Sequence, residues 1–129
     1  MFLSKNMEVK LPLVLGSSSV FRCGQLRRLG IDFQTASPDF DETPIEGEHA
    51  GETALRLAKG KARSLAAAFP AALIIGADQV AWCEGRQLGK PMNVANAQQM
   101  LADLSGKRIE FYSAIVLLNT ATDKVQHHV

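Results

Sequence analysis

The sequence predicts an α/β domain in which helices flank a layered β-sheet of mixed strand direction. Short apolar runs at 11–15, 73–80 and 109–118 indicate buried strands. Between them, apolar residues recur every three or four positions over 53–69 and again after Asn93, which is typical of amphipathic helices. A chain of 129 residues fits one domain and is long enough to bury a core.

The first part of the chain is predicted to fold as strand, turn, helix and strand. The apolar run 11–15 leads into three serines, of which Ser19 suits a helix N-cap, and Gly30 suits the end of that helix. The alternating segment 31–36 then indicates a half-buried strand. The apolar face expected for this helix comprises Phe21, Leu26 and Leu29.

The serine turn permits two interpretations. Such a turn can present backbone N–H groups and hydroxyls at a helix N-terminus, where they form a site for an anion. Arg22 falls in the first helical turn, where the helix dipole disfavours a cation unless a bound anion offsets the cost. The alternative is a capped turn with a solvated arginine, because the turn lacks the glycine spacing of a P-loop or a dinucleotide fingerprint.

Segment 37–49 is predicted to be a non-helical acidic loop, since it holds two prolines, a glycine and five carboxylates. Most such runs are solvated surface loops. A second hypothesis is that one or two of these carboxylates fold over a site and hold a hard cation, because such cations prefer oxygen ligands. The carboxylates are Asp39, Asp41, Glu42, Glu46 and Glu48.

The clearest helix is predicted over 53–69 and ends at Pro70. Lys61 neighbours the small apolar residue Ala62, so it lies at the margin of the buried face. It is either a solvated lysine or one that reaches over a neighbouring cleft. The apolar stripe comprises Leu55, Ala58, Ala62, Leu65 and Phe69.

The run 73–80, LIIGADQV, is predicted to be a buried strand that reaches a polar pair, Asp78 and Gln79. A buried carboxylate is costly unless it is paired or coordinates a cation. In open α/β sheets the ends of strands are also where ligands bind. The local alternative is that Asp78 caps a turn or a following helix.

Past this strand, the pair 84–85 marks a tight turn. Lys90 precedes a proline and is therefore expected in an extended conformation. Asn93 suits the N-cap of a second helix. Strand 109–118 follows, and 123–129 begins a further element. The residues of the second helix expected to face inward are Ala97, Leu101 and Leu104.

Charge and hydropathy exclude several classes of protein. Fourteen basic and thirteen acidic residues give a net charge of +1, which argues against a protein held to nucleic acid or a membrane by bulk charge. No apolar run approaches the roughly 20 residues of a membrane-spanning helix, and the apolar stretch near the N-terminus is too short for a signal peptide. We therefore expect a cytoplasmic protein, for which Met1 and Met7 are equally acceptable starts.

The cysteine and histidine positions indicate no metal site or disulfide framework. Cys23 and Cys83 lie 60 positions apart and form no CxxC motif, as expected for free thiols of a cytosolic protein. His49, His127 and His128 have no metal-ligand spacing either.

Six segments, in this order, resemble the Maf-like nucleotide pyrophosphatase family. They read LVLGSSSVFR (13–22), DETP (41–44), LRLAKGKARSLA (55–66), LIIGADQV (73–80), GKP (89–91) and LSG (104–106). The resemblance implies a Maf/ITPase-like fold. It also implies hydrolysis of a nucleoside triphosphate to a monophosphate and pyrophosphate with a divalent cation, Mg²⁺ or Mn²⁺.

The resemblance assigns roles to six polar positions of this chain. It places Asp78 at the family's proposed general-base position, and it makes Glu42 and Asp78 the ligands of the cation. The positions that it implies for binding the substrate are Ser17, Arg22, Lys61 and Lys90.

Two further positions resemble the subgroup that acts on 7-methyl-GTP rather than the one that acts on dTTP and UTP. These are Phe21, in place of a basic residue, and Gln79, in place of threonine. The chemistry agrees, because N7-methylguanine is cationic and an aromatic face attracts such a ring by about 1–2 kcal/mol. A glutamine side chain can also both donate to and accept from a base edge.

The chain departs from the family pattern in two places. Val20 stands where the family's serine loop usually has proline, a change that we expect to do little harm. Family members also continue well past residue 129, so we expect 1–129 to be a single Maf-like domain that lacks the C-terminal third and is incomplete there.

Three rival hypotheses follow for function and assembly. The chain binds a nucleotide without turnover, or it is a pyrophosphatase of the dTTP/UTP type, or it is an interaction protein acting in cell division, a role linked to the family. In the first two hypotheses the small-molecule partner is a nucleotide.

An exposed edge at strand 109–118 further suggests that two copies associate as a homodimer.

Overall fold

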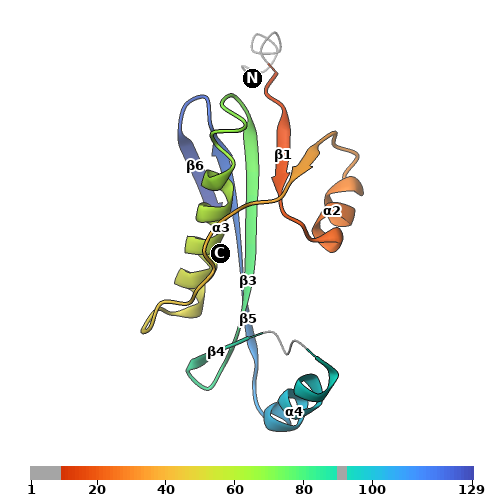
Figure 1. The fold of residues 1–129 in the computed structure, drawn as a ribbon, viewed down its shortest axis with the longest axis vertical. Helices are drawn as coiled ribbons and strands as arrows, with labels where there is room; N and C mark the ends of the chain where they lie inside the picture. The colour runs from red at the N-terminus through yellow and green to blue at the C-terminus, as the bar shows by residue number, and fades with distance from the viewer. Residues whose placement is uncertain (1–9, 90–92) are drawn as a thin grey trace.

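A six-stranded mixed sheet organises the structure, a computed structural model that describes residues 10–89 and 93–129 (Figure 1). Helices stand on both sides of this sheet, so the predicted layered α/β architecture is confirmed. The elements are β1 (Leu13–Gly16), α2 (Val20–Arg27), β2 (Gln34–Ala36), α3 (Ala50–Ser64), β3 (Leu73–Cys83), β4 (Arg86–Leu88), α4 (Val94–Leu104), β5 (Glu110–Asn119) and β6 (Lys124–His128).

Strand β3 is the centre of the sheet, whose order is β2-β1-β3-β5-β6 with β4 also paired to β3. β1 runs parallel to both of its neighbours, β2 and β3. The remaining pairs are antiparallel, and β5 accompanies β3 from Leu73↔Asn119 to Trp82↔Glu110. The long β3–β5 ladder therefore forms the rigid scaffold to which the shorter strands attach.

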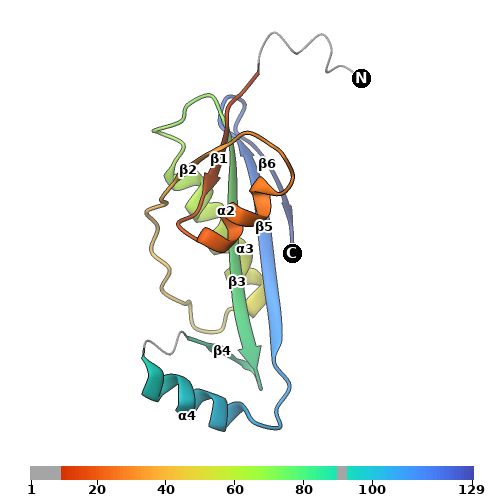
Figure 2. The same ribbon diagram turned by 90° about the vertical axis from the view of Figure 1, so that its right-hand side faces the viewer.

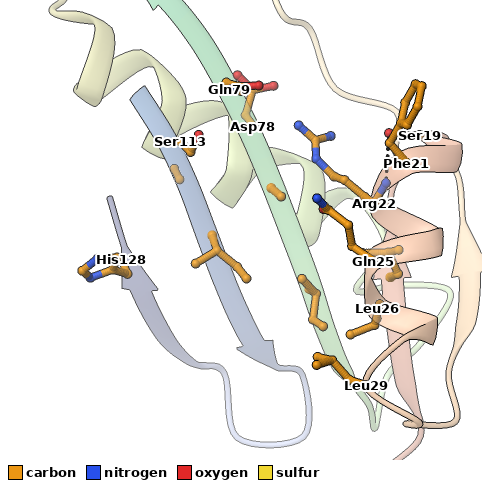
Figure 3. Close-up of a pocket in the computed structure, with 15 residues that line it drawn as sticks. Ser19, Phe21, Arg22, Gln25, Leu26, Leu29, Asp78, Gln79, Ser113 and His128 are labelled. Atoms are coloured by element: carbon orange, nitrogen blue, oxygen red, sulfur yellow. Dashed lines mark hydrogen bonds between the residues drawn. The ribbon is translucent and has the colours of Figure 1, made fainter. Parts of the chain in front are cut away.

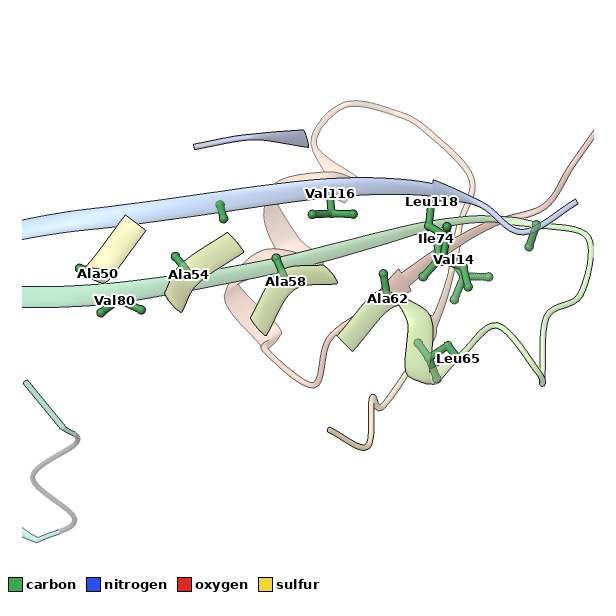
Figure 4. Packing of buried hydrophobic residues seen from close by; sticks show 12 residues of the cluster. Val14, Ala50, Ala54, Ala58, Ala62, Leu65, Ile74, Val80, Val116 and Leu118 are labelled. Carbon is green, nitrogen blue, oxygen red and sulfur yellow. The ribbon is translucent and has the colours of Figure 1, made fainter. Parts of the chain in front are cut away.

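Helix α3 covers one face of this ladder at close range because its buried side is made mainly of alanines (Figure 4). Ala50, Ala54, Ala58 and Ala62 recur every four residues and are fully buried. They pack with Ile74, Val80, Val116 and Leu118 in one core cluster. The predicted stripe is thus correct at Ala58, Ala62 and Leu65, whereas Leu55 and Phe69 are only half-buried.

The boundaries of α3 differ from the predicted 53–69. The helix begins at Ala50 because His49 caps it: His49 Nδ1 accepts a hydrogen bond from the Gly51 N–H at 3.0 Å. Glu52 Oε1 in turn accepts from the His49 N–H at 3.2 Å, which completes a capping box. The helix ends at Ser64, and turns occupy the following residues.

The far end of the molecule holds the β3–β4 hairpin and α4 (Figure 2). The predicted turn is present, with Glu84 at φ 49° and Gly85 at φ 82°, both in the left-handed region that tight hairpins use. Asn93 caps α4 as expected, because its side chain accepts from the Asn96 N–H at 2.8 Å. Of the residues expected to face inward, Ala97 and Leu104 are half-buried but Leu101 is 71% exposed, and no residue of α4 is fully buried.

Three smaller expectations also change. Strand β2 spans only Gln34–Ala36 of the predicted 31–36. Strand β5 was expected to have an exposed edge, but β6 covers part of that edge by pairing with it from Ile115↔His128 to Asn119↔Lys124. Phe21 of α2 is 82% exposed, and Leu29, which follows the end of the helix at Arg27, is 68% exposed, so the predicted apolar face does not enter the core. Across the described ranges, no helix combines the length and apolar character that crossing a membrane requires.

Candidate active site

The candidate site lies at an interruption along one edge of β3. Along one edge of β3, pairing with β1 stops at Gly16↔Gly76, and pairing with β4 starts at Ala81↔Leu88. The other edge of β3 is paired with β5. Among the described residues, no strand pairs with 77–80 on the first edge. The interruption leaves room for side chains from the serine turn, the acidic loop and α3 to reach Asp78.

Asp78 points to the α3 face and meets the lysine that the sequence placed at the margin of that helix. Lys61 Nζ donates to Asp78 Oδ1 at 2.7 Å, and both side chains are nearly buried, at 12% and 10% exposed. Glu42 Oε1, from the acidic loop, lies 3.2 Å from the same Nζ. The idea that Asp78 merely caps a turn is therefore wrong, because it sits within the eleven-residue β3 and is charge-paired.

The two carboxylates converge on one ammonium group, which shows that the site gathers oxygen donors around a positive charge. In the described part of the chain, no three or more His, Cys, Asp or Glu side chains are grouped so that they could hold a metal ion by themselves. Magnesium is commonly held by one or two carboxylates together with substrate phosphates and water. The Glu42 and Asp78 pair fits a cation of this kind and does not fit an all-protein cage.

The serine turn places a second positive charge beside the interruption. Ser17 Oγ accepts from the Ser19 N–H at 3.0 Å and from Arg22 Nη1 at 3.5 Å, while Ser19 Oγ caps α2 by accepting from the Arg22 N–H at 3.3 Å. The partner of the guanidinium here is a neutral hydroxyl, so its charge stays available to an anion. The anion-site interpretation of this turn thereby gains structural support.

A cavity of about 940 Å³ lies between α2 and the sheet face opposite α3 (Figure 3). Phe21 and Gln79, the two positions predicted to set specificity, both line it, as do Arg22 and Asp78. Much of the remaining lining is apolar and comprises Leu15, Leu26, Leu29, Ile75, Ala77, Ala114 and Ile115. The cavity thus joins an apolar chamber to the charged groups at the strand interruption.

Three polar residues that line this cavity, Gln25, Ser113 and His128, were missed from the sequence. Gln25 follows Phe21 by four positions, so helical spacing places both on one face of α2, and Figure 3 shows its amide directed toward β3. Ser113 lies directly across the ladder from Gln79. The spacing of Gln25 was a usable signal, whereas Ser113 needed the register of β3 and β5.

Lys90, the remaining predicted substrate-binding residue, lies outside the described residues. The structure therefore brings together Glu42, Lys61 and Asp78, places Ser17 and Arg22 beside them, and lines the adjoining cavity with Phe21 and Gln79.

The acidic loop has a second attachment to α3, through Glu48. Hydrogen bonds from Arg56, and then from Thr53, hold the pKa of the Glu48 carboxyl below its usual value of 4.5. Within the loop itself, hydrogen bonds from the Thr43 side chain and backbone lower the pKa of the Asp41 carboxyl. The loop is thus fastened by carboxylates that stay ionised into the acid range.

Stability is expected to depend on pH through Glu48. Because its pKa is lowered on folding, its contribution to the free energy of unfolding is present above about pH 4.5 and is lost as the pH falls through the lowered value. Urea unfolding of the natural chain and of Glu48→Gln, at neutral pH and in steps below pH 4.5, measures this. The stability difference between the two should shrink toward acid. A difference of the same size at every pH would contradict the assignment.

Comparisons with known proteins agree with this geometry. The family model described as Maf-like protein matches residues 12–129. A "7-methyl-GTP pyrophosphatase" of Neisseria meningitidis serogroup A is 71% identical over 95% of this chain and 63% of that protein. One of Nitrosospira multiformis is 51% identical over 92% of this chain and 60% of that protein. The chain therefore spans less than two thirds of the length of these curated relatives.

Solved structures share the fold at low identity. The Staphylococcus aureus Ham1 protein matches with a TM-score of 0.58 and 18% identity, over 90% of this chain and 67% of that one. A nucleoside-triphosphatase, or dITP/XTP pyrophosphatase, of Mycobacterium abscessus matches with a TM-score of 0.55 and 19% identity, over 92% and 70%. These likenesses confirm the predicted Maf/ITPase-like fold. Since the family model covers nearly all of the sequence, the chain belongs to the Maf-like family.

Proposed function

We propose that the chain hydrolyses 7-methyl-GTP to 7-methyl-GMP and pyrophosphate. The observation that carries the proposal is the convergence of Glu42, Lys61 and Asp78 at the interruption of β3, next to a cavity lined by Phe21 and Gln79. Two relatives that bear the name 7-methyl-GTP pyrophosphatase, at 71% and 51% identity, support the same substrate.

The proposed chemistry is attack of water at the α-phosphorus. Asp78, whose carboxylate lies in the charged group with Lys61 and Glu42, takes the proton of that water. A new bond forms from the water oxygen to phosphorus while the bond to the β-phosphate oxygen breaks, and pyrophosphate leaves. A divalent cation held by Glu42 and Asp78, Mg²⁺ or Mn²⁺, would supply positive charge at the phosphate oxygens.

The remaining polar groups bind the phosphates and set the geometry. Arg22 and Lys61 carry positive charges on either side of the interruption, and we assign them, with Lys90, to the triphosphate. Ser17 keeps the Arg22 guanidinium at the N-terminus of α2, where the backbone dipole also favours an anion. We propose the cytoplasm as the compartment, in keeping with the free thiols of Cys23 and Cys83.

The base is assigned to the cavity. Phe21 lines it from α2 and Gln79 from β3, so an aromatic face and an amide approach a bound base from two elements. Phe21 is 82% exposed, which leaves its ring free to stack. The predicted preference for a methylated, cationic purine therefore has a physical basis.

A substrate panel tests the proposal. Pyrophosphate release should be fastest with 7-methyl-GTP, slower with GTP, dTTP and UTP, and dependent on added Mg²⁺ or Mn²⁺. Phe21→Ala should raise the KM for 7-methyl-GTP by about tenfold, since a cation–π contact contributes about 1–2 kcal/mol. Phe111→Ala is the matched control, because Phe111 is also exposed but lies outside the cavity lining. Equal rates on dTTP and 7-methyl-GTP would overturn the substrate assignment.

Binding without turnover is the second candidate. It is favoured by the openness of the cavity to water at Phe21 and Leu29, since water exclusion strengthens the electrostatics that hydrolysis uses. Thermal-shift stabilisation by 7-methyl-GTP, measured beside pyrophosphate release, separates the two. A shift without release would replace hydrolysis by binding.

A further inference from the structure

Arg56 fastens the acidic loop to α3 at two points. Its Nε lies 3.0 Å from Glu48 Oε2 and 3.2 Å from Oε1, and its Nη2 donates to Glu48 Oε1 at 3.1 Å. The same Nη2 donates to the backbone carbonyl of Thr43 at 3.3 Å. We call Arg56, Glu48 and the Thr43 carbonyl the Arg56 clamp. It holds both ends of the segment 43–48 with one guanidinium group.

Neighbouring contacts make the clamp rigid. Thr53 Oγ1 donates to Glu48 Oε1 at 2.7 Å and accepts from Gln87 Nε2 at 2.6 Å, so β4 is joined to the same carboxylate. The Glu48 side chain is 13% exposed and that of Arg56 26%, so the pair is better shielded than an ordinary surface ion pair.

The part of the acidic loop before Glu42 contacts α3 through a different residue, Phe40. The ring of Phe40 lies directly over Gly60 of α3, so closely that a methyl group at Gly60 would overlap it. Glu42 therefore stands between two anchors, Phe40 on one side and Thr43 on the other. Its own side chain is 60% exposed and has few constraints apart from Lys61.

We infer that Arg56 is a positioning residue that sets the affinity of the site for its divalent cation by holding Glu42 next to Asp78. An exposed carboxylate on a loop loses conformational freedom when it binds a cation, and a loop that is already fixed loses less. Partners that orient metal ligands typically change the affinity for the metal by 10- to 100-fold. The inference rests on the proposed function in that it takes Glu42 as a cation ligand.

The test measures binding of Mn²⁺ alone to the full chain, so it does not require turnover. Arg56→Met removes the clamp from α3, Glu48→Gln weakens it from the loop, and Arg56→Lys keeps the charge without the fork of donors. Arg63→Met is the matched control, because Arg63 lies on the same helix and pairs only with the exposed Asp123, at 3.0 Å, among the contacts described. Hydrogen exchange of 41–49 and of β3 and β5 is recorded for each variant.

Arg56→Met and Glu48→Gln should weaken Mn²⁺ binding by about tenfold, Arg56→Lys should weaken it less, and Arg63→Met should not change it. Exchange should accelerate in 41–49 while β3 and β5 keep their protection. With 7-methyl-GTP, the Mn²⁺ concentration at half-maximal rate should rise while kcat at saturating Mn²⁺ stays within about threefold.

Other outcomes separate the inference from the proposed function. If the natural chain binds Mn²⁺ and Arg56→Met binds it as tightly as Arg63→Met does, the positioning role is overturned and the proposed function stands. If weaker binding comes with lost protection across β3 and β5, Arg56 has a general structural role, and the inference is again overturned. If the natural chain itself binds no Mn²⁺, both the positioning role of Arg56 and the assignment of Glu42 and Asp78 as cation ligands are overturned.

Discussion

Asp78→Asn is expected to lower the turnover of 7-methyl-GTP by at least about 100-fold. The amide cannot accept the proton of the attacking water, and a positioned general base contributes about 10²- to 10⁴-fold. The fold should survive, because Asn is nearly isosteric and its oxygen still accepts from Lys61, which also keeps Glu42 as a partner at 3.2 Å. Steady-state pyrophosphate release and thermal unfolding measure the two effects.

Asp123→Asn is the matched control for that substitution. Asp123 also accepts from a cation on α3, Arg63, but its side chain is 78% exposed and it lies in the β5–β6 turn. Its φ of 56° is one that asparagine tolerates well. Activity of Asp123→Asn should equal that of the natural chain. Retained activity in Asp78→Asn would remove Asp78 from the reaction.

Gly76→Ala is expected to cost several kcal/mol of stability, or to prevent folding altogether. A Cβ at this position would overlap the carbonyl oxygen of Ala58 and come within 3.0 Å of Ala62 Cβ. Both belong to the fixed backbone and core of α3, so the helix must move away from β3. Because Lys61 lies beside this contact on α3, any surviving protein should also bind nucleotide more weakly.

Gly24→Ala provides the comparison. Gly24 lies within α2, and an added Cβ meets no atom within 4 Å, so alanine should be neutral or stabilise by up to about 1 kcal/mol. Urea unfolding of both variants gives the free energies. Equal stabilities for the two alanine variants would contradict the close approach of α3 to β3.

Elements with strong local signals were predictable from the sequence. The predicted strand 73–80, which contains Asp78 and Gln79, lies within β3. Ser19 caps α2, as its position just before the helix indicated. The start of α3 was not foreseen, because histidine is outside the usual N-cap set, although here its Nδ1 accepts from the Gly51 N–H and Glu52 accepts from its backbone N–H.

Packing partners were harder to foresee than elements. Periodicity placed Leu101 on the apolar side of α4, but it does not reveal whether anything covers that side, and Leu101 is 71% exposed. Lys61 was placed at a margin of α3, while its pairing with Asp78 needed the crossing of α3 over β3. Arg56 gave no signal because its partners depend on the path of a non-helical loop.

The alternation of side chains along β3 separates the two roles that we propose for adjacent residues. The Asp78 carboxylate faces α3 and Lys61, whereas the Gln79 side chain points to the opposite face of the sheet, and both residues line the cavity. Under the proposed function, a substitution at 79 would therefore alter which base is accepted while the backbone that carries 78 keeps its register with β5. Under the proposed function, single changes on one side of the strand would exchange one nucleotide for another without rebuilding the groups assigned to hydrolysis on the other side.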